Sequence, residues 1–323
     1  MVDRIILIAN IKNAPNKGYS RHMSQFNFGK KITNELLANA IKKSGFKLIV
    51  YSTLKEFLNN ISYHKNDLIF PYYHGVGSKF RQSYVQSICE SYNLKYIGAD
   101  AYAMTVANDK VLSKDLCRKI GIKSPSCKIF YSDSFPIDIE LLKLPLIVKP
   151  QFEGDSIGIS KKGIFDRYEN ALKYAKKLNQ ELNQPILIEE FLKGKEISAC
   201  LIGHKETLKK INLVELVKRD SSVYSYKSKK TPHVYRNVNS LLSNDLYNKI
   251  HQVFSILDKV EFMRIDFIFN GEFRMIELTP DPSLSPLSCI FNSIHGELRY
   301  EEFIGYLIEN CIERYNSLNR ISL

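Results

Sequence analysis

Short apolar runs alternate with segments of helical periodicity along this chain, and this alternation limits the folds that it can adopt. Residues 4–10, RIILIAN, form an apolar run without polar alternation, which is typical of a strand buried on both faces in a parallel sheet. The same patterns predict further strands at 46–51, 67–70 and 95–97, and helices at 30–44 and 79–92. Strands and helices in this order predict a small doubly wound α/β domain near the start of the chain.

The rest of the chain carries a different succession of elements. We expect a second, smaller α+β unit with helices at 103–120 and 168–182 and strands at 128–131 and 144–149. Further strands are expected at 186–189, 196–202, 211–217, 262–269 and 272–278, with helices at 244–257 and 300–315. A polar stretch at 219–240 is expected to form a lid, because loops of that length are usually functional or disordered. We place the domains at 1–98, 99–184 and 185–323.

Composition and charge restrict the class of protein. The apolar content of 44% is ordinary for a folded globular chain, and no apolar run reaches the roughly 18 to 20 residues that span a bilayer. We therefore expect a cytoplasmic protein without a membrane partner. The net charge of +12 is carried by lysines spread along the chain without a nucleic-acid-binding motif, so we expect no nucleic-acid partner. The six cysteines include no CxxC pair and are expected to be buried thiols.

A lysine followed by a glycine-containing loop is the first motif with chemical meaning. Lys149 ends one of the expected strands, and the segment EGDSIG follows it at 153–158. Glycines let backbone NH groups approach an anion closely, and a lysine adds a mobile positive charge. The motif suits a phosphate site, although an ordinary turn between two strands has the same local pattern.

Carboxylates lie in or after three later strands. Glu189 and Glu196 flank a turn with Gly194, where an adenine edge and ribose hydroxyls can bind. Asp266 and Glu277 lie on two neighbouring strands, and on each strand the acidic residue alternates with large apolar residues, so it points to the opposite face. Two carboxylates on facing strands offer the hard oxygen ligands that magnesium prefers. The alternative is that each carboxylate is a solvent-facing charge.

Taken in order, these motifs resemble those of the ATP-grasp superfamily, and specifically of the D-alanine:D-alanine ligase family. The matching segments are YIGA at 96–99, NDK at 108–110, GIKSP at 121–125, KP at 149–150, EG at 153–154, EEFLKG at 189–194, Glu196, RID at 264–266 and Glu277. The resemblance implies an ATP-grasp fold, α/β and α+β in class, with an N-terminal doubly wound domain. It also implies an ATP-dependent carboxylate–amine ligase that forms an acyl phosphate, uses ATP with Mg²⁺ or Mn²⁺, and assembles as a homodimer.

The resemblance further implies which residues hold the nucleotide. ATP would lie between the central and C-terminal parts of the chain. The residues implied are Lys110 and Lys149 for the phosphates, Glu153 and Gly154 in the phosphate loop, Glu189 and the backbone of Leu192 for adenine, and Glu196 for ribose.

Metal, catalytic and substrate residues follow from the same resemblance. Asp266, Glu277 and Thr279 would hold the metal. Arg264 would steady the acyl phosphate and the oxyanion formed when the amine attacks. The remaining residues implied are Lys229 at the γ-phosphate, Ser156 as a further catalytic residue, Ser288 at the carboxylate of the second amino acid, and His74 and Ser283 near the substrates.

The sequence departs from the family pattern mainly around the amino-acid substrates. The early glycine, serine and glutamate motif for the first D-alanine is absent, and the acidic segment expected after His74 and Gly75 reads VGSKFR at 76–81. Thr279 stands where the family has a metal-binding asparagine, with Asp281 as an alternative ligand, and Ser283 stands for a glycine of the oxyanion pocket.

Two further departures are complementary in charge. Asp155 replaces the serine of the phosphate loop, and Lys230 replaces the lid tyrosine that normally bonds to that serine. We expect these two residues to form an ion pair that clasps the lid over the phosphate loop.

These observations lead to one interpretation and two alternatives. The favoured interpretation is a ligase of two amino acids or a small peptide whose first substrate is not D-alanine, because the departures gather on the substrate side. One alternative is D-alanine:D-alanine ligase itself with a rebuilt pocket. The other is a degenerate ATP-grasp protein that binds nucleotide without ligase activity, although a pure binder has no need for Arg264.

Overall fold

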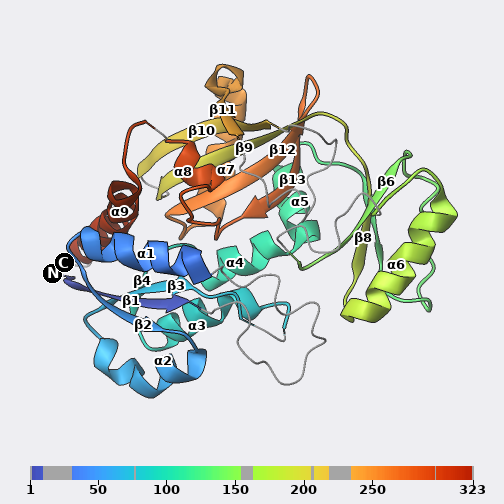
Figure 1. The fold of residues 1–323 in the computed structure, drawn as a ribbon. Coiled ribbons are helices and arrows are strands. Elements are labelled where there is room, and N and C mark those ends of the chain that lie inside the picture. Colours follow the sequence, from blue (N-terminus) through green and yellow to red (C-terminus); the bar gives the residue numbers. More distant parts are fainter. Residues whose placement is uncertain are drawn as a thin grey trace.

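The structure is a computed structural model that describes residues 2–9, 31–75, 78–153, 163–204, 207–217, 234–294 and 296–321. In this part of the chain the strands form three sheets (Figure 1). None of the helices in the described ranges is long and apolar enough to cross a membrane.

The first sheet is parallel and is covered by helices on both faces. Its strands, in spatial order, are β2 (Lys47–Tyr51), β1 (Arg4–Ala9), β3 (Leu68–Tyr72) and β4 (Lys95–Tyr96). Its helices are α1 (Lys31–Lys43), α2 (Leu54–Asn60) and α3 (Tyr84–Ser91). Side chains of β1 alternate between two cores: Ile5 and Leu7 pack with α1, whereas Ile6 and Ile8 pack with α2 and α3. The doubly wound arrangement predicted for this part is confirmed.

The second sheet is antiparallel and small. It consists of β5 (Cys127–Phe130), β8 (Ile186–Glu190), β6 (Leu146–Pro150) and β7 (Ile164–Phe165), with α6 (Tyr168–Leu182) packed against it. The strand β8 follows residue 184 in the chain but pairs with β5 and β6. The domain boundaries at 98 and 184 stay a prediction.

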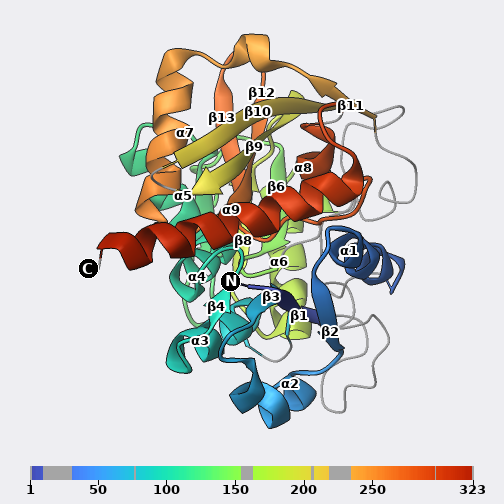
Figure 2. The ribbon, with the colours of Figure 1, turned by 90° about the vertical axis from the view of Figure 1, so that its left-hand side faces the viewer.

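The third sheet is antiparallel and has five strands, compared with four in each of the other two described sheets. Its order is β11 (Val234–Asn237), β10 (Thr207–Val217), β9 (Lys195–His204), β12 (Phe262–Phe269) and β13 (Phe273–Thr279). One face packs against α4 (Ala101–Asn108), α5 (Lys110–Lys119) and α7 (Asn244–Ile256). The other face packs against α8 (Cys289–Asn292) and α9 (Tyr300–Ile321). Figure 2 shows α9 running between this sheet and the first one, and a single apolar core joins all three.

The structure differs from the sequence prediction in the boundaries of several elements and contains some elements that were not predicted. The helix expected at 103–120 is two helices, because Asp109 leaves the helical conformation and caps α5 by accepting hydrogen bonds from the backbone NH groups of Val111 and Leu112. The helix expected at 79–92 begins with a 3₁₀ turn over Arg81–Ser83. Part of the expected lid, 234–237, is the edge strand β11, and α2 and α8 were missed.

Candidate active site

Helix α5 positions the first site residue. Lys110 follows the cap residue Asp109, whose carboxylate also accepts a hydrogen bond of 2.9 Å from Gln151 at the end of β6. Lys110 is 3% exposed, lies with its Nζ 3.3 Å from Glu277 Oε1, and donates to the backbone carbonyl of Glu153. One ammonium group therefore joins β13 to the segment where the expected phosphate loop begins.

A second cluster surrounds Glu189 on β8. Lys149 Nζ on β6 lies 2.7 Å from Glu189 Oε1, and Lys114 Nζ on α5 lies 3.0 Å from Glu189 Oε2. All three side chains are buried. Burial opposes ionisation of Glu189, but Lys114 and Lys149 together hold the pKa of its carboxyl below the ordinary value. Sequence reasoning missed Lys114, although its position four residues after Lys110 places both lysines on one helix face.

The two carboxylates expected at the metal face each other across neighbouring strands. Asp266 on β12 pairs directly with Glu277 on β13, and Ser198 of β9 donates to Asp266 Oδ1 at 2.6 Å. Burial raises the pKa of Asp266 even though Arg264 opposes this shift. The pKa of Glu277 is lowered despite burial, chiefly because of Lys110 and then Lys149 and Arg264. The two acids are thus held in different electrostatic environments.

Arg264 lies beside this pair on β12. Its Nε is 2.7 Å from Asp266 Oδ1, and its Nη2 donates to Thr279 Oγ1 at 3.5 Å. Arg264 and Thr279 are register partners across β12 and β13. The structure therefore brings together the three cations and two acids that the sequence singled out: Lys110, Lys149, Arg264, Asp266 and Glu277.

The donor atoms at this place fit magnesium. Asp266 and Glu277 supply carboxylate oxygens from facing strands, and Thr279 adds a hydroxyl at the end of β13. Magnesium commonly takes one or two protein carboxylates and completes its shell with phosphate oxygens and water. Within the described ranges no group of three or more His, Cys, Asp or Glu side chains gathers as a metal cluster. Asp281, the alternative ligand, lies instead with its Oδ2 3.4 Å from His74 Nδ1.

Two distant segments meet where the sequence predicts the amino-acid substrates. His74 and Gly75 follow β3, and a Cβ atom at Gly75, where φ is +62°, would lie 2.4 Å from the carbonyl oxygen of Arg81. The side chain of Arg81 in turn lies 2.7 Å from Glu153 Oε2. The segment that the family resemblance expects to be acidic therefore supplies a cation that contacts the start of the phosphate loop.

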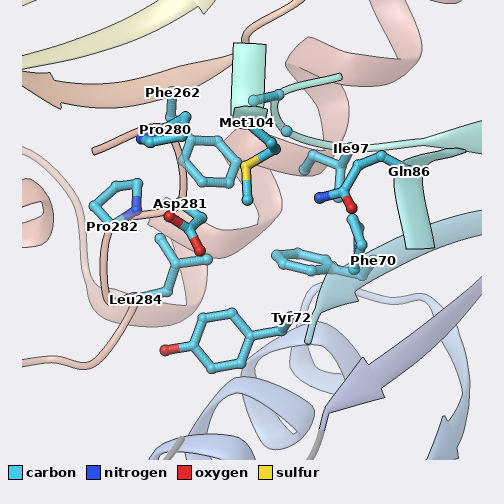
Figure 3. Close-up of a pocket in the computed structure, with 13 residues that line it drawn as sticks. Phe70, Tyr72, Gln86, Ile97, Met104, Phe262, Pro280, Asp281, Pro282 and Leu284 are labelled. Atoms are coloured by element: carbon cyan, nitrogen blue, oxygen red, sulfur yellow. The ribbon is translucent and has the colours of Figure 1, made fainter. Parts of the chain in front are cut away.

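A small cavity lies next to Asp281, between β3 and the turn after β13. Figure 3 shows Asp281, Phe70 and Leu284 among the residues around it. Its volume of about 20 Å³ holds about one water molecule and is too small for an amino acid. This cavity is therefore not a substrate pocket.

The remaining predicted residues lie at the ends of elements. Ser288 is buried and caps α8 by accepting from the backbone NH of Phe291 at 3.4 Å, whereas Ser283 is exposed. Leu192 is half-buried, and Glu196 pairs in register with Ile268. Gly154, Asp155, Ser156, Lys229 and Lys230 lie outside the described residues, so the predicted lid clasp does too.

Comparisons with known proteins identify the family of the chain. The family described as D-ala D-ala ligase C-terminus matches residues 118–309. A D-alanine–D-alanine ligase of Pelagibacter ubique is 30% identical to this chain, and the matched region covers 90% of this chain and 93% of that ligase. A D-alanine–D-alanine ligase of Aquifex aeolicus is 26% identical, and the matched region covers 80% of this chain and 87% of that ligase. In fold, the chain is similar to the D-alanine–D-alanine ligase of Bacillus anthracis complexed with ATP, with a TM-score of 0.73, 19% identity and coverage of 98% and 99%. This chain therefore belongs to the D-alanine–D-alanine ligase family of ATP-dependent carbon–nitrogen ligases with the ATP-grasp fold.

Proposed function

We propose that this protein uses ATP to convert a carboxylate substrate into an acyl phosphate and then joins it to the amine of an amino acid or small peptide. The observation that carries this proposal is the convergence of Lys110, Lys149 and Arg264 on Asp266 and Glu277. A carboxylate is a poor electrophile because its charge repels a nucleophile, so phosphorylation provides a good leaving group. Fixed cations neutralise the charge that develops on the phosphoryl group and on the tetrahedral oxyanion.

The proposed roles follow the positions of the side chains. Lys110 and Lys149 contact the phosphates, and Glu189 with the backbone of Leu192 takes the adenine. Arg264 stands two register positions from the carboxylate pair, where it can neutralise an acyl phosphate and the oxyanion that follows. Asp266, Glu277 and Thr279 would hold Mg²⁺ or Mn²⁺, which would help to neutralise the negative charge of the phosphates.

We also propose that the first substrate is not D-alanine. The contacts that support this are the pairing of His74 with Asp281 and the pairing of Arg81 with Glu153, both on the substrate side. D-alanine–D-alanine ligase activity is the second candidate, because the Pelagibacter and Aquifex relatives carry that name.

Release of phosphate from ATP across a panel of D- and L-amino acids, dipeptides and hydroxy acids tests these alternatives. We expect turnover with a pair other than two D-alanines, and an Arg264→Met variant should lose turnover while retaining ATP binding. Turnover with D-alanine alone would establish the second candidate. Tight ATP binding without turnover on any substrate pair would instead identify a nucleotide-binding protein without ligase activity.

Three further features stay proposals. We propose a cytoplasmic homodimer without nucleic-acid or membrane partners, divided into domains at 1–98, 99–184 and 185–323. We also propose that Asp155 and Lys230 pair when the lid closes. A Lys230→Asp variant should therefore show weaker substrate affinity or slower turnover, and unchanged kinetics would count against the clasp.

A further inference from the structure

Two buried lysines on one face of α5 link the two sheets that surround the candidate nucleotide site. Lys110 and Lys114 are four residues apart, so they lie one above the other on the helix. Lys110 connects Glu277 of β13 with the carbonyl of Glu153 after β6. Lys114 connects β13 with β8 one turn further along the helix.

The side chain of Lys114 lies entirely in the protein interior. Its side chain is fully buried, and its Nζ donates to the carbonyl oxygen of Ile276 at 2.9 Å and lies 3.0 Å from Glu189 Oε2. A buried lysine is costly unless it has a partner, so it would not be placed here for packing alone. Lys114 thus acts as a fixed counter-ion of Glu189.

Lys149 is placed differently from Lys114. It shares the carboxylate of Glu189 through Oε1, but it lies near the end of β6, immediately before the segment that leads to the expected phosphate loop. When the ammonium group of Lys149 contacts a phosphate of ATP, it gives up its ion pair with Glu189. In the absence of Lys114, Glu189 would then be a fully buried carboxylate without a cation, and such a group favours its neutral form. Glu189 would then lose the charge that makes it a strong acceptor.

Glu189 has acceptor capacity left for a ligand. Its Oε2 receives no well-aligned hydrogen bond from the described residues, although Lys114 neutralises it electrostatically. An ionised carboxylate accepts a hydrogen bond from an exocyclic amino group and repels a carbonyl oxygen. A carboxylate at this place therefore distinguishes an amino-purine such as adenine from guanine, whose corresponding group is a carbonyl.

We propose that Lys114 is a positioning residue that keeps Glu189 ionised and oriented for the base while Lys149 serves the phosphates. The inference rests on the proposed ATP site, since it assigns to Glu189 a contact with the base. Lys114 acts only through Glu189 and through its hydrogen bond to β13, and it touches no substrate.

Equilibrium titration with ATP and with GTP tests this proposal without requiring ligase turnover. The proteins compared are the unmodified chain and the variants Lys114→Met, Glu189→Gln and the double variant, with Lys119→Met as a matched control at the exposed end of α5. We expect the ratio of the GTP to the ATP dissociation constant to fall at least tenfold in Lys114→Met and to be unchanged in Lys119→Met. The double variant should be no less selective than Glu189→Gln, because both changes remove the same interaction.

The outcomes separate the inference from the function it rests on. A melting curve defines the temperature at which each variant is folded, and titration is carried out below it. An unchanged ratio in folded Lys114→Met, or additive losses in the double variant, overturns the role of Lys114. If Lys114→Met does not fold, a double variant that is less selective than Glu189→Gln still overturns the role of Lys114, because that role acts only through the Glu189 carboxylate. An unmodified protein that binds no ATP overturns the proposed function as well.

Discussion

A buried ion pair at the junction of the first sheet, β12 and α9 allows one prediction to be worked out in detail. Glu261 is fully buried just before β12, and its Oε1 accepts from Arg314 Nε of α9 at 2.6 Å. Its Oε2 accepts from the backbone NH of Gly98, at the end of the first sheet, at 2.5 Å. One carboxylate therefore joins three parts of the fold.

The change Arg314→Met keeps the apolar stem but leaves Glu261 as a buried charge without its arginine. Breaking a buried pair in this way costs about 3–5 kcal/mol of unfolding free energy. Unfolding entropies of about 2.1 cal/mol/K per residue give about 0.7 kcal/mol/K for 323 residues, so the melting temperature should fall by about 4–7 °C.

Differential scanning calorimetry at neutral pH measures this shift. The matched control is Arg299→Met, which removes an exposed ion pair with Glu302 and should leave the melting temperature unchanged. The double variant Glu261→Gln with Arg314→Met should recover part of the loss, because it leaves no buried charge. A melting temperature of Arg314→Met equal to that of the control would refute this reasoning.

Three further predictions concern the site. Lys110→Met should weaken binding of ATP by about 10- to 100-fold and leave adenosine binding unchanged in calorimetric titration, because a charge-assisted hydrogen bond contributes about 1.5–3 kcal/mol; equal losses for both ligands would contradict it. Gly75→Ala should lower the unfolding free energy by about 1–3 kcal/mol in urea denaturation, because a Cβ there would meet the carbonyl of Arg81 at positive φ; an unchanged transition midpoint would show that the turn relaxes freely. Lys114 and Lys149 hold the pKa of the Glu189 carboxyl below its ordinary value against the effect of burial, so removal of Lys114 should raise that pKa. Titrations of a Lys114→Met variant should therefore show a preference for ATP over GTP that increases with pH as Glu189 ionises, whereas the unmodified protein should show no such increase; parallel pH profiles would contradict this.

The sequence alone was enough to predict most elements, because strands and helices leave a period in the chain that needs no knowledge of distant residues. The alternation of polar and apolar residues on the two strands predicted that Asp266 and Glu277 lie on the face opposite the large apolar side chains, and the family resemblance added Arg264. In the structure they lie on that face, with Asp266 opposite Glu277 and Arg264 opposite Thr279. The break at Asp109 was missed, since the segment is apolar at helical spacing on both sides of it.

The contacts between distant segments could not be predicted from the sequence and became visible in the folded chain. The pairs Lys114 with Glu189, Arg81 with Glu153 and His74 with Asp281 join residues from different sheets or loops. A local period tells which face of an element is buried, but not which part of the chain packs against that face. Whether a buried lysine is charged can be inferred only once its partner is known, because burial lowers its pKa and a paired carboxylate raises it.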